Sequence, residues 1–205
     1  MKLFLTSLAS ETLDLVLPLL PDNPKNIRVA FIPTAADPYV GQDMPWLDAD
    51  RAKLAAMQFV VTDYDLKNKN VDLLRQELNQ FQVIFVEGGN TFYLLNEIKK
   101  SGFDVVIQEL LAKGVIYIGA SAGSMILGPD LNHLVKIDHP EQVPKLIDYT
   151  CLSIIKERII PHLGRDKYAS VHAILQKEWG DKILPLRDDQ VLIVNGDNIE
   201  VVTKK

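Results

Sequence analysis

A serine set among small residues, Ser121 in the stretch Gly119-Ala-Ser-Ala-Gly123, is the feature of this sequence that most directly suggests chemistry. An apolar run, residues 115–118, precedes the stretch and another follows it, so Ser121 stands where a buried strand ends and a helix begins. In a Gly-x-Ser-x-Gly pattern the glycines allow a tight turn that exposes the serine hydroxyl. The pattern predicts Ser121 as a nucleophile, although small residues at a strand–helix junction can also serve packing alone.

A serine nucleophile needs a general base, which is usually a histidine oriented by a carboxylate. Of the four histidines, His162 is the best placed, because it follows the run Arg-Ile-Ile-Pro, residues 158–161, at the expected end of another strand. The other three lie in an irregular segment or inside a helical pattern, namely His133, His139 and His172. We therefore expect His162 to lie on the same rim as Ser121.

The acid that would orient His162 is less clearly marked. Asp138 ends a short apolar alternation between Ser121 and His162, and it is the best-placed candidate. Asp130 and Asp148 compete with it for the same role.

A second chemical element is the stretch 87–92, Glu-Gly-Gly-Asn-Thr-Phe, which also follows an apolar run. Adjacent glycines before a helix start, with Asn90 or Thr91 as the cap, leave backbone N–H groups free to bind an anion or an oxyanion. The alternative is an ordinary strand-to-helix turn. Glu87, directly before the glycines, either binds a substrate amino group or simply ends the strand.

These residues must be positioned by an alternation of strands and helices. Apolar runs predict strands over 2–7, 28–35, 59–66, 82–89 and 115–121, and helical periods predict helices over about 11–20, 45–57, 71–79, 91–100 and 103–112. Several strands are apolar nearly throughout, as strands covered on both faces require. We therefore predict a three-layer α/β fold with a doubly wound, mostly parallel sheet, whose ligands bind beyond the carboxyl ends of the strands.

The alternation of strands and helices ends after about residue 127. An irregular stretch leads to the run that ends at His162, and a helix is predicted near 167–179. The remaining tail, residues 183–205, resembles antiparallel strands joined by turns, with Asn195-Gly196 as the strongest hairpin signal. The whole chain, 1–205, is predicted to form a single domain.

Composition narrows the function. The 205 residues are 47% hydrophobic and 24% charged, with a net charge of −5 and no basic stripe, which argues against nucleic acid as a partner. No apolar run approaches the length of a membrane span, and the opening residues resemble a first strand more than a signal peptide. With a single cysteine, Cys151, the simplest expectation is a cytoplasmic protein without disulfides. We expect no metal or other cofactor, a short peptide as substrate and a homodimer as the candidate assembly.

The motifs together resemble the peptidase E family, which comprises aspartyl dipeptidases and relatives such as cyanophycinase, on a fold similar to class I glutamine amidotransferases. The resemblance covers most of the chain and rests on residues 31–35, 88–95, 119–124, 136–140 and 161–168. It implies a serine peptidase with Ser121 as nucleophile, His162 as base and Asp138 as orienting acid. It also implies an oxyanion hole formed by the N–H groups of Gly89 and Ala122.

Two positions depart from the family pattern. Members that cut after an amino-terminal aspartate carry an arginine in the segment after the histidine, whereas here Arg165 and Lys167 are the early cations and neither is clearly in register. Arg165 is the candidate for binding an acidic substrate side chain, and Glu87 and Asn90 are the other candidate substrate contacts. Glu87 also stands where a further glycine is more usual.

Other classes of function remain as alternatives. An α/β-hydrolase esterase shares the serine turn but normally places its histidine near the carboxyl end, whereas His162 is followed by a further helix and hairpin. A glutamine amidotransferase would need cysteine at position 121. A binding or sensory protein without activity, or a serine esterase or amidase acting on non-peptide substrates, could keep the same scaffold.

Overall fold

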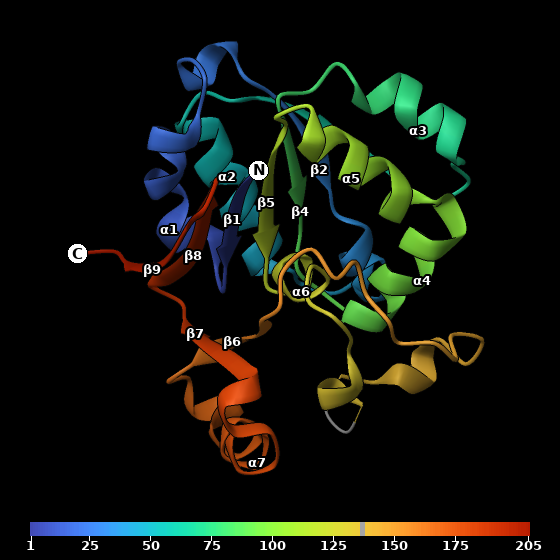
Figure 1. Ribbon diagram of the computed structural model, residues 1–205, viewed down its shortest axis with the longest axis vertical. Helices are drawn as coiled ribbons and strands as arrows, with labels where there is room; N and C mark the ends of the chain where they lie inside the picture. Colours follow the sequence, from blue (N-terminus) through green and yellow to red (C-terminus); the bar gives the residue numbers. More distant parts are fainter. Residues whose placement is uncertain (136–137) are drawn as a thin grey trace.

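In a computed structural model, which describes residues 1–135 and 138–205, the chain folds around one large sheet (Figure 1). The sheet has seven strands in the order β3-β2-β4-β5-β1-β8-β9. The first five strands run parallel, and β8 and β9 join antiparallel at one edge. These strands are β1 (Lys2–Thr6), β2 (Arg28–Ile32), β3 (Val60–Asp63), β4 (Val83–Val86), β5 (Ile116–Ala120), β8 (Gln190–Asn195) and β9 (Asn198–Thr203).

The central strands are apolar throughout because both faces of the sheet are covered. In β2, Ala30 and Ile32 pack into the core on one face, while Val29 and Phe31 pack into the core on the other. All four side chains are fully buried. Alternating side chains of a strand point to opposite faces, so a strand between two helical layers has no position for a polar residue until it ends.

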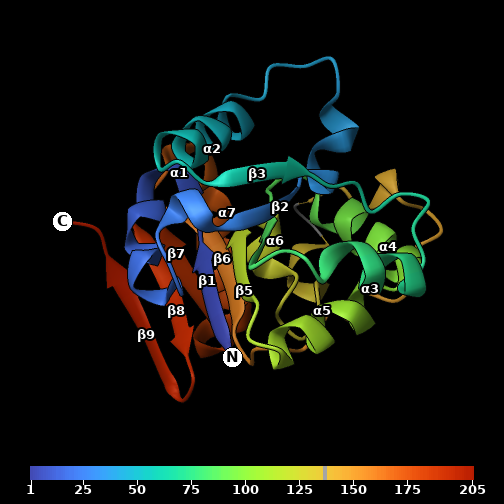
Figure 2. The same cartoon turned by 90° about the horizontal axis from the view of Figure 1, so that it is seen from above.

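Helices form the two outer layers. Figure 2 shows α1 and α2 on one side of the sheet and α3, α4 and α5 on the other. The predicted three-layer α/β fold is thus confirmed. None of the helices within the described ranges is long and apolar enough to cross a membrane. The helices are α1 (Ala9–Thr12), α2 (Pro45–Ala56), α3 (Val71–Leu78), α4 (Thr91–Ser101), α5 (Phe103–Ala112), α6 (Ala122–Met125) and α7 (Ala169–Trp179).

The predicted helix over about 11–20 is only partly α-helical. After the short α1, the chain continues as a 3₁₀ helix, η1 (Leu13–Leu19), which contains Pro18. Proline has no N–H to donate and its ring crowds the preceding turn, so a regular α-helix is disfavoured there. Six further 3₁₀ segments are η2 (Pro24–Asn26), η3 (Thr34–Tyr39), η4 (Asn132–Leu134), η5 (Pro140–Gln142), η6 (Asp166–Tyr168) and η7 (Gly180–Lys182).

The carboxyl-terminal part differs from the prediction in one strand. The hairpin between β8 and β9 is confirmed, with Gly196 in the left-handed region at φ 64°. However, β7 (Ile183–Arg187) does not join this hairpin. It pairs in parallel with β6 (Arg158–Leu163) in a separate two-stranded sheet. Figure 1 shows this pair and α7 beyond the end of β5.

Candidate active site

Ser121 lies on a sharp turn between β5 and α6. Its backbone has φ 47° and ψ −104°, a conformation that costs energy for a residue with a Cβ. The flanking glycines are required by space: a Cβ at Gly119 would lie 2.6 Å from the Gly123 carbonyl oxygen, and one at Gly123 would lie 2.0 Å from the Val86 oxygen. The Gly-x-Ser-x-Gly pattern therefore forms the predicted tight elbow.

Hydrogen bonds hold this strained turn in place. The Ser121 N–H donates to the Thr6 carbonyl oxygen at 3.0 Å, which ties the elbow to the neighbouring strand β1. The buried Ser124 hydroxyl lies 2.8 Å from the same oxygen and 2.7 Å from that of Gly119. The Tyr117 hydroxyl donates to the Gly123 carbonyl at 2.7 Å. Such fully buried, satisfied groups fix the position of the Ser121 hydroxyl.

His162 reaches Ser121 from the end of β6, as predicted. Its Nε2 lies 3.3 Å from the Ser121 Oγ, within hydrogen-bond reach of a base and its nucleophile. The backbone of His162 is also in the left-handed region, at φ 67°, and its N–H donates to the Ser7 Oγ at 2.7 Å. The imidazole ring stacks on Tyr168, with 5.2 Å between ring centroids. The hydrogen bond to Ser7 and the stacking on Tyr168 therefore fix both the backbone and the imidazole ring of His162.

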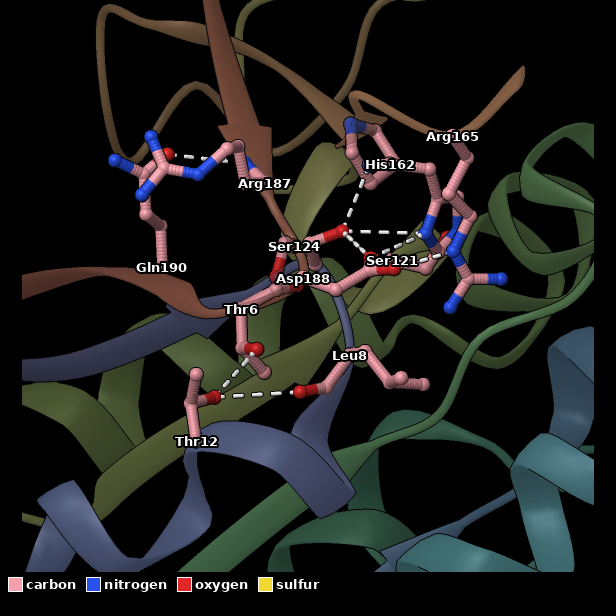
Figure 3. A network of polar contacts seen from close by, with 12 residues as sticks. Thr6, Leu8, Thr12, Ser121, Ser124, His162, Arg165, Arg187, Asp188 and Gln190 are labelled. Atoms are coloured by element: carbon pink, nitrogen blue, oxygen red, sulfur yellow. Dashed lines mark hydrogen bonds and ion pairs between the residues drawn. The ribbon is translucent and has the colours of Figure 1, made fainter. Parts of the chain in front are cut away.

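Asp188, in the turn between β7 and β8, completes this chain of hydrogen bonds (Figure 3). Its Oδ1 lies 2.8 Å from His162 Nδ1 and accepts a hydrogen bond of 2.6 Å from the Ser7 hydroxyl, while Oδ2 accepts one from Arg165 Nε. Burial acts to raise the pKa of Asp188, but the hydrogen bonds from His162, Ser7 and Arg165 outweigh it and hold that pKa well below its usual range. Asp188 is therefore ionised at neutral pH.

The predicted partner of His162, Asp138, lines the same cavity but does not contact the histidine. Its carboxylate accepts a hydrogen bond of 3.1 Å from the Thr91 N–H, at the start of α4, and burial raises its pKa. The competing acids pair with cations, Asp130 with Arg158 and Asp148 with Lys99. The predicted contact between Asp138 and His162 is thus corrected to one between Asp188 and His162. Two residues of the Asp138 motif, 136 and 137, lie outside the described residues.

The contact between Asp188 and His162 follows from the strand topology. Because β6 and β7 are parallel, with Leu163 opposite Arg187, the residue that follows β7 comes to lie beside His162. If residues 183–205 are interpreted as antiparallel strands, the turn at 188–189 lies at the end of a hairpin, and its proximity to His162 is not predicted. The signal available in the sequence was the pair Asp188-Asp189 directly after an apolar run.

The glycine turn after β4 lies next to the elbow, as predicted. A Cβ at Gly88 would lie 3.2 Å from the Ser121 Cβ. Gly89, at φ 143°, leaves no room for a side chain, since a Cβ there would lie 2.1 Å from the Ala35 carbonyl oxygen. The Gly88 N–H donates to Glu87 Oε1 at 2.7 Å. By contrast, the N–H groups of Gly89 and Ala122 have no acceptor within the described parts of the chain.

Two of the predicted substrate contacts have partners within the protein. Asn90 is fully buried and caps α4: its Oδ1 accepts the Tyr93 N–H at 2.8 Å, and its Nδ2 donates to Gln142 at 3.0 Å. Its side chain is therefore used to start the helix rather than to face a ligand. Arg165 lies in the cavity wall with its Nε on Asp188, so a substrate contact of Arg165 stays a prediction.

A cavity of about 450 Å³ opens above Ser121 and His162, which is enough for a short peptide. Its lining includes Gly88, Gly89, Asp138 and Arg165, together with the aromatic side chains of Tyr39, Trp46 and Tyr168 and the carboxyl groups of Asp50 and Glu87. No group of three or more His, Cys, Asp or Glu side chains within residues 1–135 and 138–205 is arranged to hold a metal ion.

Comparison with known proteins shows which family the chain belongs to. The model of peptidase family S51 matches residues 3–202. The chain belongs to peptidase family S51. The S51 chain is 29% identical to an uncharacterized peptidase of Listeria monocytogenes, over 100% of its own length and 98% of the relative's. It is also 27% identical to a peptidase E of Shewanella amazonensis, over 68% of its own length and 65% of the relative's.

Solved structures agree. The S51 chain superposes with a TM-score of 0.91 on the crystal structure of a "putative peptidase E protein" from Listeria monocytogenes EGD-e, with 26% identity and coverage of 100% and 98% of the two chains. A peptidase from an acI-B1 Actinobacterium shares the fold, with a TM-score of 0.71 at 17% identity and coverage of 99% and 87%. The predicted resemblance to the peptidase E family is confirmed, and membership of peptidase family S51 identifies the chain as a peptidase.

Proposed function

We propose that this S51 chain is a serine peptidase that hydrolyses dipeptides or other short peptides through an acyl-enzyme. The observation that carries the proposal is the continuous chain of contacts Ser121–His162–Asp188, at 3.3 and 2.8 Å, on the wall of a cavity of peptide size. Nucleophile, base and orienting acid in this order of contacts are what acyl transfer at neutral pH requires. Asp188 takes the role that the sequence assigned to Asp138.

In the acylation step, His162 Nε2 takes the proton of the Ser121 hydroxyl as the oxygen attacks the scissile carbonyl carbon. The carboxylate of Asp188 stabilises the imidazolium ion that forms and keeps its Nδ1 proton directed away from Ser121. The imidazolium then gives the Nε2 proton to the leaving amine, and the C–N bond breaks. In deacylation a water molecule replaces Ser121 as the nucleophile, and the same proton transfers release the acid product.

The developing oxyanion needs donors that are free before the reaction. The N–H groups of Gly89 and Ala122 support this role, because neither has an acceptor in the described residues. Glu87 helps by accepting the Gly88 N–H, which holds the Glu87–Gly88 peptide at the start of the glycine turn. Preorganised backbone donors of this kind contribute several kcal/mol to transition-state stabilisation.

Covalent labelling tests the proposed function. A fluorophosphonate is expected to modify the purified protein once per chain, at Ser121, because only a serine activated by a base attacks this reagent quickly. Mass spectrometry of the digested protein locates the label, and a library of dipeptides and short peptides then identifies substrates. Ser170→Ala is the matched control, since Ser170 is an exposed serine on α7. Absence of labelling at Ser121 together with no peptide hydrolysis would contradict the proposal.

Arg165 provides a prediction about specificity. Because its Nε is bound to Asp188, we propose that it positions the acid rather than selecting the substrate. Arg165→Ala is therefore expected to lower kcat/KM about 10-fold for an Asp-X dipeptide and for a neutral dipeptide alike. Arg187→Ala, which removes an exposed arginine paired with Asp189 in the same turn as Asp188, is the control. A loss confined to Asp-X would instead assign Arg165 to the substrate's acidic side chain.

A further inference from the structure

Two buried carboxyl groups lie on the wall of the cavity that contains Ser121. Asp50 comes from α2 and Glu87 from the end of β4, and each is 1% exposed. Both line the cavity together with Ser121 and His162. The proposed hydrolysis uses Glu87 only through its bond to Gly88, and it does not use Asp50. A pair of buried acids at this place therefore needs a separate explanation.

The two carboxyl groups are hydrogen-bonded to each other, and each also accepts a backbone N–H. Asp50 Oδ1 accepts the Ser10 N–H at 2.6 Å, and Glu87 Oε1 accepts the Gly88 N–H at 2.7 Å. Apart from the proton shared with Asp50, the buried Glu87 Oε2 has no donor within the described residues. Burial raises the pKa of Asp50 to about 6, and burial together with the charge of Asp50 raises that of Glu87 well above its usual value. In the free protein the pair therefore holds a proton at neutral pH.

No protein cation forms an ion pair with Asp50 or Glu87 within the described residues. Arg51 lowers the pKa of Glu87 through its charge, but its guanidinium group pairs with Asp63 at 2.6 Å and lies 4.5 Å from the centre of the Phe31 ring. Burying a charge without a partner costs several kcal/mol. A proton or a cationic ligand must therefore neutralise the pair.

We propose that Asp50 and Glu87 form a cation subsite that takes an ammonium or guanidinium group of the substrate. This inference rests on the proposed peptidase function. When the proton shared by Asp50 and Glu87 leaves, Glu87 Oε2 has no donor within the described residues and can accept from a cation. Tyr39 and Trp46, whose rings meet edge to face in the same cavity wall, offer aromatic surfaces to that cation. On binding, the cation replaces the proton held by the two carboxyl groups, and that proton passes to the buffer.

The position of the subsite limits which part of a peptide it can bind. Glu87 is bonded to the N–H of Gly88, and a Cβ built on Gly88 would lie 3.2 Å from the Ser121 Cβ, so the subsite adjoins the nucleophile. This proximity assigns the cation to the residue whose carbonyl is attacked. It is either the free main-chain amino group of that residue or a basic side chain on it. The two groups are cations of the same chemistry, and calorimetry with acetylated and free peptides separates them.

Isothermal titration calorimetry on Ser121→Ala, which binds substrate without turnover, tests the subsite. The ligands are Ala-Phe, N-acetyl-Ala-Phe and N-acetyl-Lys-Phe, each titrated at pH 6.5 in two buffers of different ionisation enthalpy. We expect the cationic ligand to bind about 10- to 100-fold more tightly than N-acetyl-Ala-Phe, with release of up to one proton. Tight binding of Ala-Phe alone identifies the main-chain amino group, and tight binding of N-acetyl-Lys-Phe identifies a side chain.

Glu87→Gln and Asp50→Asn, each added to Ser121→Ala, are expected to remove the proton release and most of the preference for the cation. Both keep the size of the side chain and an oxygen acceptor, and they lie on different elements, so one remains informative if the other fails to fold in thermal unfolding. Glu97→Gln is the matched control, because Glu97 is also a buried glutamate but pairs with Lys100 on α4, away from the cavity.

Equal affinities for all three ligands, or a preference unchanged in both Glu87→Gln and Asp50→Asn, would overturn the cation subsite. Fluorophosphonate labelling of the parent protein keeps this outcome distinct from failure of the proposed function. If Ser121 is labelled and the preference is absent, only the subsite is refuted. If cation binding releases a proton but Ser121 is not labelled, the subsite stands and the hydrolase assignment fails.

Discussion

Ser121→Ala is expected to lower kcat/KM for the best short-peptide substrate by about 10³-fold or more while leaving the fold intact. The hydroxyl that attacks the carbonyl is lost, but alanine fits the same space on the elbow. The strained backbone is held by contacts that do not involve this hydroxyl, namely the Ser121 N–H on Thr6 and the buried hydroxyl of Ser124. Steady-state kinetics on purified protein, with circular dichroism as the check on folding, measure both parts of the prediction.

His162→Ala should cause a loss of similar size, and the double variant should be little worse than either single one. The reason is that a nucleophile without its base, or a base without its nucleophile, contributes little. Losses that multiply in the double variant would mean that the two residues act independently. Undiminished turnover in Ser121→Ala would reject the serine-peptidase mechanism altogether.

The second large effect is expected at Asp188. Asp188→Asn should lower kcat by about 10²- to 10⁴-fold, because the amide cannot stabilise the imidazolium ion and can impose the wrong tautomer on His162. Asp138→Asn should cost much less, since the asparagine side-chain oxygen can still accept the hydrogen bond from the Thr91 N–H. Kinetic constants of the two variants, measured side by side, decide which acid serves the base.

Circular dichroism separates a role in orienting His162 from a general loss of structure. Asp188→Asn should keep the spectrum of the parent protein while losing turnover, because asparagine has the same size as aspartate. Asp189→Asn is the control, because Asp189 lies next in the same turn and pairs with Arg187 instead. A neutral Asp188→Asn together with an inactive Asp138→Asn would restore the assignment made from the sequence.

The parts of the site that were predictable from the sequence are those encoded by a few consecutive residues. The elbow at Ser121 follows from an apolar strand and two glycines whose missing Cβ atoms make room for the Gly123 and Val86 backbone. The turn at Gly88 and Gly89 and the place of His162 at a strand end were readable in the same way. Strand identity was also readable, because strands buried on both faces must be apolar throughout.

What only the tertiary structure decided is the identity of residues that meet across the chain. Asp188 lies 26 residues after His162 and reaches it because β6 and β7 pair in parallel. Ser7 lies 155 residues before His162 and holds both its backbone and Asp188. Local periodicity indicates that a segment is a strand, but not which strand it pairs with or in which direction. That choice depends on the packing of the whole sheet.

The same limit explains the residues whose roles changed. The sequence predicts that Asn90 either caps the helix or contacts a substrate, and that Asp138 orients His162; only the structure shows that the start of α4 uses both side chains. The pairing of Asp50 with Glu87 joins a helix to a strand end 37 residues further along, and no local pattern marks it. The sequence by itself thus determined the fold class, the tight turn that carries Ser121 and the strand end at which His162 lies. The tertiary structure decided which carboxyl groups face the reaction, because their environment depends on distant segments.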